Sequence, residues 1–130
     1  MNISHSIHEA AAAILLELGV APIKVNGDLA KAWIIAEKGF DGDGWQWNNP
    51  LNTTQPDKLA VNANSAGVKI YPSKEQGLYD TAKTLKNGYY PHLLTGLMEA
   101  KAEIFFAVPA ELDTWGSGYF NVNRIYNQIK

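Results

Sequence analysis

Residues 29–39 read LAKAWIIAEKG, and this run predicts the central helix of the fold. Its apolar side chains recur at the three- and four-residue spacing that places them on one face of a helix: Leu29, Ala32, Trp33 and Ala36. Asn26 or Asp28 can cap the start of the helix, and Gly39 can end it. The run therefore predicts a buried helix whose last turn carries Glu37 and leads into a polar segment.

One helix is predicted before this run and several after it. The first extends from Ser4 or Ser6 to Leu18, where Gly19 can end it. The later ones are a helix from a Ser73–Gln76 capping box to about Lys86, a helix that begins at Pro91, a short buried helix over 104–108 that Pro109 stops, and a final amphipathic helix through Val122, Ile125, Tyr126 and Ile129.

The segment from Phe40 to Ser73 has a different composition. It is dense in Gly, Asn, Asp and Pro, and helical periodicity disappears. Short extended pieces around residues 51–54 and 68–71 predict a small β-hairpin among loops. With no internal repeat or linker, residues 1–130 are interpreted as one domain of the α+β class, mostly α-helical, with a hairpin and loop insertion between helices.

The composition excludes several classes of function. The 130 residues are 46% apolar and 18% charged, which is typical of a globular domain and not of a disordered chain. The net charge of −2 disfavours nucleic acid as a partner and gives no attraction to anionic membranes. The absence of cysteine excludes disulfides, zinc–thiolate sites and cysteine nucleophiles.

No targeting segment or cofactor motif is recognised. The longest apolar stretch, Ala10 to Leu16, is too short to span a bilayer, and no positively charged segment leads into it. We therefore predict no signal peptide, no membrane insertion and synthesis in the cytoplasm. Phosphate-binding glycine loops, dinucleotide fingerprints, HExxH and G-x-S-x-G are absent, so no cofactor is predicted.

Glu37 is the first candidate for chemistry. It follows Trp33 by one turn and lies at the C-terminal end of its helix, where the helix dipole disfavours negative charge. A carboxyl group that keeps its proton near neutral pH can act as a general acid. The alternative is a solvated glutamate at a helix end, paired with Lys38 or Lys31.

Two aromatic segments are candidates for binding sugars. Residues 45–55, WQWNNPLNTTQ, combine indole rings with amides and hydroxyls, which match the C–H faces and hydroxyl rims of a saccharide. Residues 115–118, WGSG, allow a tight turn that holds an aromatic ring at a cleft edge. The alternative for both is structural: a turn-rich loop whose tryptophans cover the core, and a plain connection between helices.

The remaining ionisable residues give weaker signals. His5 and His8 lie one helical turn apart, but no third ligand is apparent, so solvated helix residues are favoured and no metal is predicted. Asp41, Asp43 and Asp57 could each be the second acid of a glycosidase or a turn residue.

The order of these features resembles the small lysozyme-like domains of bacteriophages and their bacterial relatives, within the lytic transglycosylase and goose-type lysozyme superfamily. The resemblance covers nearly the whole chain, and its most specific parts are the runs NNPLNTT at 48–54 and TLKNGYY at 84–90. The other matching features, in order, are Leu18-Gly19-Val20, Ala32-Trp33, Glu37, the run GVKIYPS at 67–73, Gly77 and the WGSG run.

The resemblance implies an enzyme that cleaves the β-1,4 bond between N-acetylmuramic acid and N-acetylglucosamine in peptidoglycan. Glu37 matches the catalytic glutamate that ends a core helix and faces a hairpin. That hairpin is matched by strands at 52–54 and 69–71. The residues expected to line the substrate cleft are Asn49, Asn52, Thr53, Thr54, Tyr71 and Trp115.

The resemblance leaves two points open. No second carboxylate can be placed, so hydrolysis and intramolecular transglycosylation are both compatible with the sequence. An inactive saccharide-binding or virion structural module with the same fold is the alternative. In either case the chain would act on the glycan strands of the cell wall. It would reach them as part of a phage particle, or after release through a membrane pore made by another protein.

Overall fold

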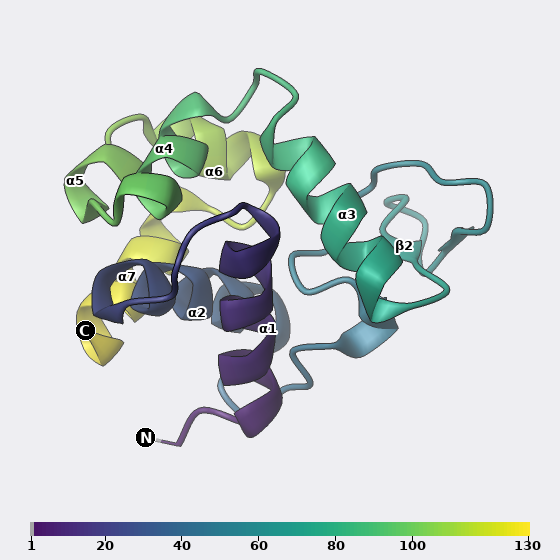
Figure 1. Ribbon diagram of the computed structural model, residues 1–130, viewed down its shortest axis with the longest axis horizontal. Coiled ribbons are helices and arrows are strands. Elements are labelled where there is room, and N and C mark those ends of the chain that lie inside the picture. Colours follow the sequence, from purple (N-terminus) through teal and green to yellow (C-terminus); the bar gives the residue numbers. More distant parts are fainter. Residues whose placement is uncertain (1) are drawn as a thin grey trace.

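The computed structural model describes residues 2–130, and helices make up most of it (Figure 1). The elements, in order, are α1 His5–Glu17, α2 Lys24–Lys38, the 3-10 turn η1 Gln46–Asn48, β1 Val61–Asn62, β2 Lys69–Ile70, α3 Lys74–Leu85, α4 Pro91–Glu99, α5 Ala102–Phe105, α6 Pro109–Trp115 and α7 Tyr119–Ile129. The prediction of a mostly helical α+β chain is confirmed. In the part of the chain described, no helix has the length and hydrophobicity needed to cross a membrane.

Helix α2 is the central element. It packs against α1, α4, α5 and α7, and its residues Leu29, Ala32, Trp33 and Ile34 are fully buried. The Trp33 ring meets the rings of Phe105 and Trp115 edge to face, with centroids 5.7 and 4.8 Å apart. Burying side chains of this size contributes about 1.5–3 kcal/mol each, so α2 is fixed firmly and its last turn has a defined position.

The start of α2 corrects the prediction that Asn26 or Asp28 caps the helix from outside. The helix begins at Lys24, and Asn26 lies inside its first turn. From there the Asn26 Oδ1 accepts a hydrogen bond from the Ile23 amide at 2.7 Å. Asp28 pairs with Lys24 at 2.8 Å, so both polar residues stabilise the first turn from within.

The hairpin is shorter than expected: the predicted strand around 68–71 is confirmed as β2, but its partner is β1 at 61–62 and not the segment 51–54. The two strands are antiparallel, with Val61 opposite Ile70 and Asn62 opposite Lys69. Figure 1 shows this region on the far side of α3 from the helical core. The predicted strand over 51–54 is wrong, because Asn52 adopts a left-handed backbone with φ 55° that interrupts an extended chain.

Helix α6 was not predicted, because Pro109 was interpreted only as the stop of the preceding helix. Proline also fits the first turn of a helix, where no backbone N–H is needed, and α6 begins with it.

Of the two hydrogen bonds of the predicted Ser73–Gln76 capping box, one is confirmed: the Ser73 Oγ accepts from the Gln76 amide at 3.1 Å. The Gln76 side chain instead bonds Asp80.

Helix α3 approaches the η1 loop so closely that only glycine fits at the contact. A Cβ at Gly77 would lie 1.6 Å from the carbonyl oxygen of Asn48, which is backbone and cannot move independently. Gly27 in α2 is a matched helical glycine, and a Cβ there would meet nothing within 4 Å.

We therefore expect Gly77→Ala to lower the free energy of unfolding by about 1–3 kcal/mol or more through overpacking. Gly27→Ala should raise it by about 0.5–1 kcal/mol, because alanine is the better helix former. Thermal or urea unfolding of the two variants checks this. Equal stability of both would contradict the close packing of α3 on η1.

Candidate functional site

The Glu37 carboxyl group is held between two segments that are distant in sequence. It projects from the last turn of α2 and is half-buried. Asn52 Nδ2 donates a hydrogen bond to Oε1 at 2.8 Å, and Ser117 Oγ donates to Oε2. Asn52 comes from the segment after η1, and Ser117 from the connection between α6 and α7. Three parts of the chain therefore converge on one carboxyl group.

The direction of the Ser117 hydroxyl is set by the core. Trp33 is fully buried, and its Nε1 donates to Ser117 Oγ at 2.7 Å. An indole N–H can only donate, and leaving it unpaired inside the core would cost about 1–3 kcal/mol. Because Ser117 accepts from Trp33, its own hydrogen is free to point at Glu37.

A small cavity shares one residue, Asn52, with the surroundings of this carboxyl group. It encloses about 180 Å³ and is lined by Asn52, Thr53, Thr54, Thr84, Tyr90, Thr114 and Trp115. The Trp115 ring forms one wall, fixed by edge-to-face contacts with Trp33 and Tyr90 and by a hydrogen bond of 2.7 Å from its Nε1 to the Leu51 carbonyl. The lining thus combines an aromatic side chain with several hydroxyl groups.

Four of the predicted substrate residues therefore meet at one place. Asn52, Thr53, Thr54 and Trp115 all line this cavity, and Asn52 joins it to Glu37. Thr84 extends the hydroxyl lining from α3, and its Oγ1 lies 2.8 Å from that of Thr53.

Asn49 and Tyr71, predicted to line the cleft, are buried instead. Asn49 is 0% exposed, and its amide is used by the backbone: Nδ2 donates to the carbonyls of Thr53 (2.9 Å) and Lys69 (2.8 Å), while Oδ1 accepts from the Thr53 amide (2.9 Å). Tyr71 is 1% exposed, its hydroxyl donates to the Gln55 carbonyl at 2.6 Å, and burial raises its pKa. Neither side chain lines the cavity next to Asn52, because both are buried and bonded to the loop backbone.

Lys38 and Ser117 belong to the site but were not predicted as site residues. Lys31, considered as an ion-pair partner of Glu37, pairs with Asp28 at 3.2 Å. Lys38 turns toward the loop and donates to Asn52 Oδ1. A lysine at a helix end and a serine between glycines are usually solvated, so residue type alone gave no signal for either.

Asp41 and Asp43 lie on the loop that follows α2, and neither is among the partners of Glu37, which are Asn52 and Ser117. Asp41 is exposed, and the exposed Asp43 accepts from the Trp45 amide at 2.8 Å. His5 lies 3.1 Å from Glu9 in an exposed pair. Within residues 2–130, no three His, Cys, Asp or Glu side chains form a group that could hold a metal ion.

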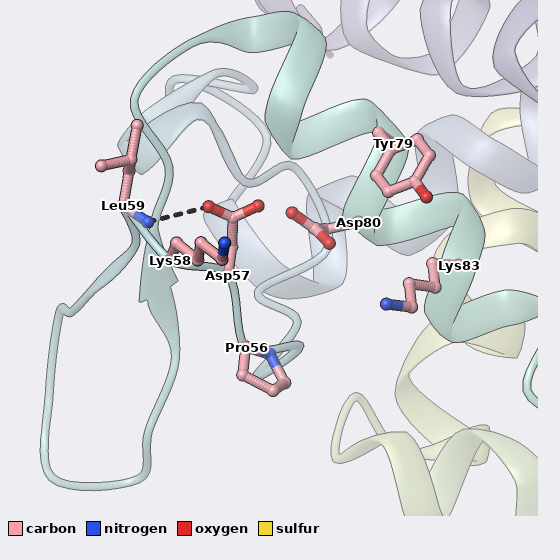
Figure 2. Close-up of a pocket in the computed structure, with 7 residues that line it drawn as sticks. All are labelled: Pro56, Asp57, Lys58, Leu59, Tyr79, Asp80 and Lys83. Atoms are coloured by element: carbon pink, nitrogen blue, oxygen red, sulfur yellow. Dashed lines mark hydrogen bonds between the residues drawn. The ribbon is translucent and has the colours of Figure 1, made fainter.

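Asp57 lines a separate and larger cavity of about 720 Å³ between the 56–59 loop and α3. Figure 2 shows its carboxyl group facing that of Asp80, with Tyr79 and Lys83 beyond. Asp80 is 2% exposed, and burial together with Asp57 raises its pKa, against the opposing effects of Gln76 and Lys83. This pair has no contact with Glu37 and is interpreted as a structural feature of the loop.

The Asp80 carboxyl should make stability depend on pH. Because its pKa is higher in the folded chain than in the unfolded chain, the folded state binds more protons, and the free energy of unfolding falls as pH rises through the raised pKa. We expect Asp80→Asn to raise the melting temperature at pH 7 and to change it little at pH 3.5. Asp41→Asn, at an exposed position, is the control. A lower melting temperature for Asp80→Asn at pH 7 would contradict this assignment.

No protein-family model, curated protein or solved structure matches the chain.

Proposed function

We propose that this chain is a peptidoglycan glycosidase of lysozyme-like fold, with Glu37 as the general acid. The bond cleaved is the β-1,4 link between N-acetylmuramic acid and N-acetylglucosamine. The observation that carries the proposal is the Glu37 carboxyl group, fixed by two donors, one of which, Asn52, also lines a cavity with Trp115 and several hydroxyl groups. Its place at the end of a buried helix agrees with the resemblance noted from the sequence.

The two donors are suited to the form of Glu37 that exists after proton transfer. As the protonated carboxyl gives its hydrogen to the glycosidic oxygen, the C1–O bond breaks and negative charge develops on Glu37. Asn52 and Ser117 are already directed at its two oxygens, so little reorganisation is needed to stabilise that charge. Each oxygen keeps a second lone pair for the proton being transferred.

The second half of the reaction uses Glu37 as a base. Its carboxylate can take a proton from an attacking hydroxyl group, which is water in hydrolysis and the muramoyl 6-hydroxyl in transglycosylation. A mechanism with one carboxylate needs only the contacts already described.

A second candidate function is a saccharide-binding or virion structural module without activity. The observation that favours it is that both Glu37 oxygens already accept hydrogen bonds within the protein. In that role the carboxylate would be a structural acceptor that joins α2 to its two neighbouring segments. In both functions the same cavity would bind glycan strands of the cell wall. The chain would do so at the wall itself or as part of a phage particle.

Substitution of Glu37 separates the two candidates. We expect Glu37→Gln to lower the rate of clearing of purified peptidoglycan by about 10²–10⁴-fold, because the amide keeps the shape but cannot donate the acid proton. Glu75→Gln, on the exposed first turn of α3, should leave the rate unchanged. Equal clearing by the wild type and Glu37→Gln would remove Glu37 from the mechanism.

Mass spectrometry of the released fragments identifies the reaction. Hydrolysis gives a reducing end, and transglycosylation gives a 1,6-anhydro end that is lighter by one water. Retained binding to peptidoglycan with neither product after long incubation would favour the module without activity.

A further inference from the structure

Lys38 extends from the end of α2 into the polar loop that follows it. Its Nζ donates to Asn52 Oδ1 and lies 3.4 Å from both the carbonyl oxygen and the Oε1 of Gln46. The Trp47 ring covers the same ammonium group, with its centroid 4.7 Å away. The ammonium group is therefore surrounded by acceptors and a π-face, and Asn52 lies between it and Glu37.

The hydrogen-bonding character of the three groups fixes how the amide points. An ammonium group has three donors and no acceptor, so only Oδ1 of Asn52 can face Lys38. The Nδ2 group must then face the Glu37 carboxyl group, as observed at 2.8 Å. We infer that Lys38 is a positioning residue for the Glu37 site, and that its ammonium group holds the Asn52 amide with its donor toward Glu37. This inference rests on the proposed function only where it concerns catalysis.

The local backbone supports a specific role for this contact. Residues 2–130 contain four non-glycine positions with left-handed φ, and three of them are Trp47 (61°), Asn48 (53°) and Asn52 (55°). Such backbone is uncommon outside glycine; asparagine tolerates it, whereas a tryptophan keeps it only where surrounding contacts impose it. Here it brings the Trp47 ring over Lys38 and the Asn52 amide between Lys38 and Glu37.

The environment of Lys38 also makes the arrangement sensitive to pH. Burial lowers the pKa of Lys38 to about 8, against the opposing charges of Glu37 on α2 and Asp43 in the loop. Above that pH the neutral amine can accept as well as donate, so it constrains the orientation of the amide less. The folded chain disfavours this ammonium relative to the unfolded chain, so removing the charge should not lower stability at pH 7.

Three variants test the role of Lys38 in catalysis. Lys38→Met removes the donors but keeps the length of the side chain, and we expect kcat on peptidoglycan to fall about 10- to 100-fold at pH 7 with an unchanged melting temperature. Lys38→Arg keeps a cation that does not titrate, so activity should persist above pH 8, where that of the wild type declines. Lys74→Met is the matched control, since Lys74 lies 4.7 Å over the Trp45 ring, and it should behave as the wild type.

The side-chain amide of Asn52 gives a readout that does not need activity. In ¹⁵N-labelled wild type and Lys74→Met, the two Asn52 amide hydrogens should shift as pH passes through about 8. In Lys38→Met that transition should be absent. Selective assignment through an Asn52→Asp sample identifies the signals.

The two measurements separate this inference from the proposed function. If the wild type is inactive but its Asn52 amide signals still shift as Lys38 loses its charge, the proposed glycosidase activity is refuted and the orientation of the amide by Lys38 is supported. An active wild type with no Asn52 transition near pH 8, or a Lys38→Met variant with wild-type kcat and pH profile, would overturn the role of Lys38.

Discussion

The hydrogen bond from the buried Trp33 indole to Ser117 joins the core of this protein to its candidate site. The indole N–H lies inside the helical core and needs an acceptor there, and Ser117 is the group that meets it. In doing so, Ser117 presents its own hydrogen to Glu37, and the connection between α6 and α7 is tied to the end of α2. The same ring packs against Trp115, which lines the cavity that Asn52 also lines. A requirement of the core thus sets the geometry of the site.

Most of the helices could be predicted, because apolar periodicity is a local property of the chain. The predictions that failed involve residues with more than one helical role. Asn26 can cap a helix from outside or from within its first turn, and Pro109 can end one helix or begin the next. In each case packing of distant segments decides between the roles. The predicted strand over 51–54 failed because the Asn52 backbone is set by its side-chain contacts.

The candidate site was predictable where sequence position carries the information. Glu37 ends a helix whose apolar face is plain in the sequence, so its location at the edge of the core followed directly. Asn49 and Tyr71 were chosen by residue type and by the resemblance, yet both are buried, since a buried polar side chain can satisfy either a ligand or the backbone. Lys38 and Ser117 were missed because their roles depend on partners 14 and 80 residues away.

The contact between Trp33 and Trp115 also gives the protein an optical property. Two indole rings with centroids 4.8 Å apart and planes inclined at 70° are close enough for their electronic transitions to couple. One of these chromophores is hydrogen-bonded through a single hydroxyl group to Glu37, and the other lines the cavity. The near-ultraviolet circular dichroism of the protein should therefore contain a contribution from this pair, which depends on the fixed orientation of Trp33 against Trp115.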